Sequence, residues 1–129
     1  MKAILLVDHG SIRREANEMM VDVMNLVQRM AGSDVVVRYA HMELAEPTIA
    51  QGFANCVEAG ATDVVVFPYM LSPGRHSTTD VPRMVKEAAA KYPGVAFSVT
   101  RAFGIEEKLG EIVLARAGIE ASSASTTPG

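Results

Sequence analysis

Continuous apolar runs alternate with segments of helical periodicity along most of the chain. Residues 3–7 form an uninterrupted apolar run, and apolar residues then recur at three- and four-residue spacing from Ala16 to Met30. The first pattern is typical of a buried strand and the second of an amphipathic helix. The alternation repeats three more times, and it predicts strands at 35–42, 64–67 and 95–99 and helices at 47–59, 82–91 and 105–117.

Repeated strand–helix units predict an α/β domain with right-handed crossovers. Uninterrupted apolar strands are typical of a parallel sheet that is buried on both faces. We therefore expect a single-domain, four-stranded parallel sheet with helices on both faces and flavodoxin-like winding, in the strand order 2-1-3-4. The expected domain covers residues 1–118, and the Ser-, Thr- and Ala-rich residues 119–129 are expected to be a disordered tail.

Composition and charge exclude several classes of protein. The 129 residues suit one domain, and the net charge of -3 excludes a broad basic surface for nucleic acid. The only cysteine, Cys56, can form no internal disulfide. The first apolar run stops at Asp8 and is too short for a signal peptide or a membrane span. These features predict a cytoplasmic protein without nucleic-acid or membrane partners.

All three histidines lie at or after the ends of predicted strands. His9 follows the first strand, His41 lies near the end of the second, and His76 lies in the connection after the third. Ligands of open α/β sheets bind outside the carboxyl ends of the strands, where the winding reverses, so the expected strand order brings His9 and His76 together with Glu43 alongside. Imidazole and carboxylate groups suit Zn, Co, Ni or Fe as divalent ions. We therefore predict a metal site with open coordination positions from His9, Glu43 and His76, with His41 as a further candidate ligand.

Each of these side chains also has a structural interpretation. His9 could hydrogen-bond the backbone of a tight turn, and His76 could be a solvated loop residue. His41 could line a pocket without binding metal. Glu43 could cap the next helix or be solvated.

The connection at residues 71–80 is longer than most strand-to-helix loops, which favours a functional role for it. It lacks the Gly-Lys-Ser/Thr core of a phosphate loop, so no nucleotide site is predicted. Asp80 comes shortly before Pro82, and we interpret both residues as the start of a helix.

Three segments carry a family resemblance: Leu5 to Ser11 (LLVDHGS), Glu43 to Ile49 (ELAEPTI), and Pro68 to His76 (PYMLSPGRH) with Asp80-Val81-Pro82. They resemble the small class II tetrapyrrole chelatases, the sirohydrochlorin cobaltochelatase and ferrochelatase family, in family order and from about residue 3 to residue 117. The resemblance implies insertion of divalent cobalt, nickel or iron into sirohydrochlorin, on the routes to cobalamin, siroheme or a nickel tetrapyrrole. It places the family's metal-binding positions on His9, Glu43 and His76, and it implies no cofactor besides the metal substrate.

Two positions depart from the family pattern. The family commonly has Arg directly after His-Gly-Ser, where this chain has Ile12, and an apolar residue where His41 stands. The first departure leaves the contact to a substrate carboxylate open, and the second could tune the choice of metal. The residues expected to contact the substrate are Ser11, Arg13, Arg14, Gly74 and Arg75.

The chemistry of metal insertion suggests a role for each of the three predicted metal-site residues. Two inner pyrrole N–H protons of sirohydrochlorin must leave as the metal enters, and a neutral imidazole can bind metal or accept a proton. We expect His9 and His76 to carry the metal and Glu43 to assist ligation or proton removal. Two alternatives are a non-catalytic metal carrier or sensor and an α/β interaction domain.

The size of the substrate suggests that two copies of the chain assemble around it. Ligand pockets bury most of their ligand and often lie between domains, and larger members of the resembled family contain two such units. We therefore expect a symmetric homodimer with the cleft between protomers.

Overall fold

The computed structural model describes residues 1–122. Its elements follow the expected alternation, with one additional π-helical turn before the third helix. In chain order they are β1 (Lys2–Asp8), α1 (Arg14–Ala31), β2 (Val35–His41), α2 (Ile49–Glu58), β3 (Asp63–Pro68), the π-helical turn (His76–Asp80), α3 (Val81–Ala89), β4 (Ala96–Val99) and α4 (Glu107–Ala117). No helix within residues 1–122 is both long and apolar enough to cross a membrane.

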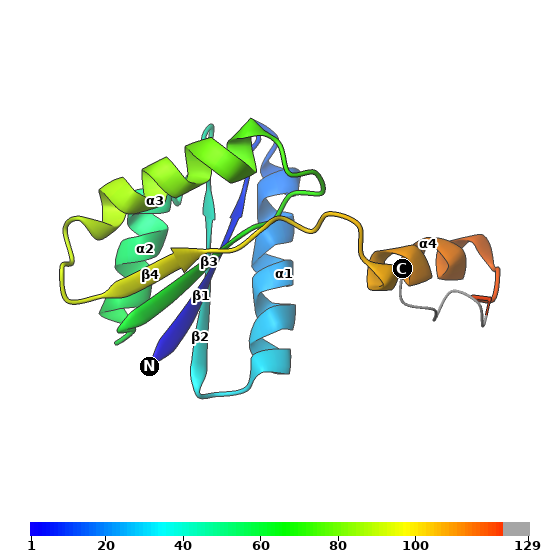
Figure 1. Ribbon diagram of the computed structural model, residues 1–129, viewed down its shortest axis with the longest axis horizontal. Coiled ribbons are helices and arrows are strands. Elements are labelled where there is room, and N and C mark those ends of the chain that lie inside the picture. Colours follow the sequence, from blue (N-terminus) through cyan, green and yellow to red (C-terminus); the bar gives the residue numbers. More distant parts are fainter. Residues whose placement is uncertain (123–129) are drawn as a thin grey trace.

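The four strands form one parallel sheet in the order β2-β1-β3-β4 (Figure 1). This confirms the predicted fold class and strand order. The chain winds from β1 to β2 on one side and then crosses to β3 on the other, so the winding reverses between β1 and β3. The carboxyl ends of those two central strands therefore define the expected ligand-binding edge.

Three of the helices cover the sheet. The helices α2 and α3 pack on one face, where Leu5, Val66 and Phe53 are fully buried. On the other face, α1 packs over β1 and β2 through Met20, which lies against Leu6 and Val37. The fourth helix lies beyond the edge of this body, at the end of an extended segment, and buries none of its residues (Figure 1).

Local sequence explains where α2 begins and ends. Thr48 accepts a hydrogen bond from the backbone N–H of Gln51, and the Gln51 side chain accepts one from the backbone N–H of Thr48. This capping box starts the helix, so the interpretation of Glu43 as its cap is wrong. Gly60, at φ +100°, follows the helix, as is common at helix ends. Of the predicted tail, residues 123–129 lie outside the described residues.

Candidate functional site

The two strands at the winding reversal bring two imidazoles together. His9 follows β1, His76 begins the π-helical turn after β3, and their ring centroids lie 5.0 Å apart with the rings nearly perpendicular. Both residues are exposed, so the pair opens to solvent at the carboxyl edge of the sheet. The predicted juxtaposition of His9 and His76 is therefore confirmed, while their role as metal ligands stays a prediction.

His76 has a carboxylate partner that the sequence analysis interpreted differently. Its Nδ1 lies 3.1 Å from Oδ2 of Asp80, four residues later. Asp80 is the N-cap residue of α3 and Pro82 lies in its first turn, as the sequence predicts, but the Asp80 side chain makes no capping hydrogen bond. In the tautomer in which Nδ1–H donates a hydrogen bond to the carboxylate, Nε2 keeps its lone pair, which is the common arrangement of a metal-binding histidine.

Gly10 allows two turns to approach each other closely. It has φ +89°, and a Cβ at this position would lie 1.8 Å from the carbonyl oxygen of Glu43. The backbone N–H of Glu43 donates to the His9 carbonyl at 3.1 Å, and that of Met42 donates to the Asp8 carbonyl at 2.8 Å. Only glycine fits this contact, and the two bonds fix the main chain of His9 against the turn that follows β2.

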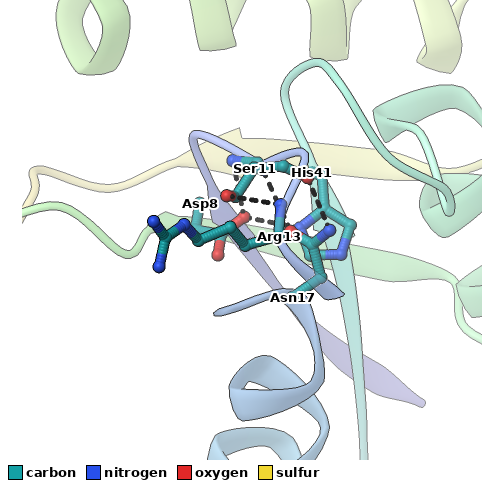
Figure 2. A network of polar contacts seen from close by, with 6 residues as sticks. Asp8, Ser11, Arg13, Asn17 and His41 are labelled. Atoms are coloured by element: carbon teal, nitrogen blue, oxygen red, sulfur yellow. Dashed lines mark hydrogen bonds and ion pairs between the residues drawn. The ribbon is translucent and has the colours of Figure 1, made fainter. Parts of the chain in front are cut away.

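Side chains from β1, β2 and α1 also hold the turn that follows β1 (Figure 2). Oδ1 of Asp8 accepts from the Gly10 N–H at 3.1 Å and lies 2.6 Å from Nδ1 of His41. Asn17 of α1 accepts from the Ser11 N–H at 3.0 Å, and its Nδ2 donates to the Ser11 carbonyl at 2.6 Å. These contacts position the turn that carries His9. Sequence reasoning missed the roles of Asp8 and Asn17, because long-range polar pairs leave no periodic signal.

The structure separates His41 and Glu43 from the imidazole pair in different ways. The His41 side chain is buried, at 1% exposed, and its Nδ1 is occupied by the contact to Asp8. Glu43 is exposed on the turn that bonds to His9 through the backbone. Among residues 1–122, no group of three or more His, Cys, Asp or Glu side chains is arranged to hold a metal ion. The ligand role of Glu43 and that of His41 stay untested.

The predicted substrate contacts lie around the same edge. The Ser11 hydroxyl accepts from the Arg13 N–H at 3.0 Å, and the Arg13 guanidinium points away from this network (Figure 2). Arg14 forms an exposed ion pair with Glu18. Arg75 is exposed directly before His76, and the carbonyl of Gly74 accepts from the backbone N–H of Thr78 at 3.0 Å and from its hydroxyl at 2.9 Å. Substrate contact by these residues stays a prediction.

Arg101 is a further candidate for contact with the substrate, and the sequence analysis missed it. It lines two hollows of about 310 and 350 Å³, one shared with Pro73 of the His76 loop and the other with Phe67 of β3. Arg101 follows β4 at the carboxyl edge, yet the sequence search considered only residues after the first three strands. The same rule applied to the fourth strand finds it.

The single cysteine lies in the core and away from this edge. Cys56 of α2 is fully buried, and burial raises the pKa of its thiol to about 11, against a smaller opposing effect of the Arg38 charge. Cys56 is therefore a core residue and takes no part in the chemistry of this edge.

Comparisons with known proteins agree with this fold. The CbiX family model matches residues 3–119. The chain is 42% identical over 110 residues to a chloroplastic sirohydrochlorin ferrochelatase of Arabidopsis thaliana, covering 85% of this chain and 48% of that protein. The sirohydrochlorin chelatase SirB from Bacillus subtilis subspecies spizizenii, solved in complex with cobalt, superposes with a TM-score of 0.83 at 32% identity, covering 91% of this chain and 50% of that chain.

The lengths of the relatives differ. The chain spans about half the length of several curated relatives that it matches. A CbiX protein from Marinobacter aquaeolei instead matches along 95% of its own chain and 92% of this one, with a TM-score of 0.74 and 25% identity. The fold thus occurs both in chains of about this length and in chains about twice as long. The family match over residues 3–119, together with the shared fold, shows that the chain belongs to the CbiX family of sirohydrochlorin chelatases.

Proposed function

We propose that the chain inserts a divalent metal ion into sirohydrochlorin, with cobalt as the preferred metal and nickel or iron as alternatives. The observation that carries this proposal is the pair of exposed imidazoles, His9 and His76, at the winding reversal of the sheet. Relatives named for cobalt and for iron chelation support the reaction class, and a homologous structure holds cobalt. Imidazole ligands bind all three of these metals, so the donor set supports more than one choice.

Two protein ligands suit an ion that is a substrate. Structural metal sites are closed by four protein ligands, whereas a site that passes its ion onward needs open positions. His9 and His76 would hold the incoming ion from one side, and the pyrrole nitrogens of the macrocycle would take over its coordination from the other. Asp80 would keep Nδ1 of His76 protonated and direct Nε2 to the metal, because its carboxylate lies 3.1 Å from Nδ1.

Proton removal from the macrocycle needs a nearby base. Glu43 is exposed on the turn after β2, and its backbone N–H donates to the His9 carbonyl, so its main chain is held beside that of His9. We assign Glu43 the role of assisting ligation or accepting a pyrrole proton. Arg13, Arg75 and Arg101 supply positive charge at this edge for the substrate carboxylates.

The assembly and location are further parts of this proposal. A single sheet edge leaves one side of a flat macrocycle uncovered, so we assign the chain to a symmetric homodimer with the substrate cleft between protomers. We retain the cytoplasm as the proposed location, although one relative carries a chloroplast designation in its name.

The test is an anaerobic insertion assay with sirohydrochlorin and cobalt, nickel and iron in parallel. His9→Ala and His76→Ala should each abolish insertion while circular dichroism and the unfolding temperature stay unchanged. Arg83→Ala is the matched surface control, since Arg83 lies on α3 and pairs only with Glu87 among the described side chains. Wild-type rates in both histidine variants would overturn the assignment. Cobalt binding without any absorbance change on adding sirohydrochlorin would instead indicate a metal carrier.

A further inference from the structure

Each of the three loops that follow β1, β2 and β3 exposes one large aliphatic side chain. Ile12 is 86% exposed, Leu44 63% and Leu71 70%. Because the strands are parallel, these loops leave the sheet at the same edge as His9 and His76. Single exposed aliphatic residues are ordinary on a protein surface, whereas several at one ligand-binding edge indicate a contact surface. We call these three aliphatic residues the aliphatic rim.

Leu44 lies in a loop that is fixed at both ends. The backbone N–H of His41 donates to the Pro47 carbonyl at 2.8 Å, which closes the loop between these two residues. The backbone N–H of Glu43 donates to the His9 carbonyl at 3.1 Å. The main chain of Leu44 is therefore held one residue away from a direct contact with the main chain of His9.

The backbone of Leu44 has a conformation that leucine rarely adopts. Among residues 1–122, Leu44 is the only residue other than glycine with a positive φ, at +71°. The Cβ of a bulky residue crowds the backbone in this region, and glycine or asparagine fits better there. Leu44 is also exposed, so packing within the chain does not offset the strain. Strain of this kind occurs where a side chain serves a function.

We propose that the aliphatic rim contacts the face of the tetrapyrrole ring, and that Leu44 holds the ring over the imidazole pair. The inference rests on the proposed function and names residues that orient its substrate. A metal ion enters a macrocycle through the face of the ring, so the surface around His9 and His76 must meet that face. The conjugated ring is largely apolar on its face and carries carboxylates at its periphery. Aliphatic side chains therefore suit the face, while Arg75 and Arg101 suit the periphery.

The substitution Leu44→Asn tests this contact, because asparagine accepts a positive φ but presents a polar amide. KM for sirohydrochlorin should rise about tenfold, as expected when one aliphatic side chain no longer covers the ring, while kcat stays unchanged. Cobalt affinity, measured by calorimetry without tetrapyrrole, should also stay unchanged. The unfolding temperature should rise, because the backbone strain is relieved. Leu44→Met keeps an apolar side chain and should retain the wild-type KM.

Met30→Asn is the matched surface control. Met30 is 79% exposed, but it lies at the end of α1, shortly before β2 begins and at the opposite edge of the sheet. Its KM should equal that of the wild type. Ile12→Asn and Leu71→Asn should each raise KM, and a wild-type KM in both would overturn the rim.

The outcomes separate this inference from the proposed function. Equal KM in Leu44→Asn and Met30→Asn, with an active wild type, would overturn the inference alone. Weaker cobalt binding or a lower unfolding temperature in Leu44→Asn would show a structural role and overturn it as well. Loss of dimer mass in light scattering would place Leu44 in a contact between copies and would also overturn it. If the wild type inserts no metal, the proposed function fails and the inference fails with it.

Discussion

Substituting Gly10 tests whether the close approach of the two turns positions His9. In Gly10→Ala the added Cβ would lie 1.8 Å from the Glu43 carbonyl oxygen, whereas an ordinary contact begins at about 3.4 Å. The turn after β2 must therefore retreat by roughly 1.5 Å. A retreat of this size breaks the two backbone hydrogen bonds from Met42 and Glu43 to the β1 end.

The expected cost has two parts. A non-glycine residue at φ +89° costs about 1–2 kcal/mol in backbone strain. Two lost backbone hydrogen bonds add roughly 1 kcal/mol each, so the sum is about 3–4 kcal/mol. For a domain of this size that lowers the unfolding temperature by roughly 10–15 °C. Because these two bonds fix the main chain of His9, metal insertion should fall far more than the folded fraction does.

Gly32 provides the matched control. It also has a positive φ, of +85°, but a Cβ there meets nothing within 4 Å. Gly32→Ala should therefore lose only the strain of about 1–2 kcal/mol and keep full activity. Urea unfolding followed by circular dichroism measures both losses, and the insertion assay at a temperature where both variants are folded measures activity. Equal losses of stability in the two variants, or full activity in Gly10→Ala, would refute the reasoning.

Three further predictions test other parts of the site and core. Arg101→Ala should raise KM for sirohydrochlorin about tenfold, because one hydrogen bond to a charged group is lost. The unfolding temperature should not change, and an unchanged KM would show that Arg101 does not contact the substrate. Asp80→Ala should weaken cobalt binding by roughly 10–100-fold in calorimetric titration, because the carboxylate orients His76, and unaltered affinity would contradict that role. The Cys56 thiol, with its pKa raised from 9.0 to about 11, should react with iodoacetamide at pH 8 at least about 100-fold more slowly in native protein than in urea. Since the unfolded chain releases this proton first, stability should also fall as the pH rises from about 9 towards 11, and rapid labelling of native protein would contradict the burial.

The fold was predictable because its pattern is local and repeated. Each apolar run and each helical stripe identifies an element without reference to the others, and the preference for right-handed crossovers limits how four such units can be wound. Once the strand order is given, the ends of β1 and β3 must meet at one edge. The approach of His9 to His76 therefore follows from topology together with the positions of two residues in the sequence.

The polar contacts around that edge were not predictable in the same way. The Asp8–His41 bond depends on the register of β1 against β2 and on burial, and neither is visible in the spacing of two residues 33 positions apart. Asp80 could be interpreted as a helix start because the sequence shows its distance from Pro82 but not the direction of its side chain. The pattern of α4 likewise predicts the helix, but not that the helix lies away from the sheet.

The two imidazoles come from elements that are held very differently, and this difference bears on how a metal is handed over. His9 directly follows the central strand β1, and its turn is fixed by the backbone bonds from Met42 and Glu43 and by the side-chain contacts of Asp8 and Asn17. His76 lies on an exposed turn, where its contact to Asp80 is local. In the proposed reaction, the rigidly held His9 would set where the ion arrives, whereas His76, on its exposed turn, would withdraw when the macrocycle takes over the coordination. Transfer needs both properties, because four rigid ligands would retain the ion and a site without a fixed ligand would not place it above the pyrrole nitrogens.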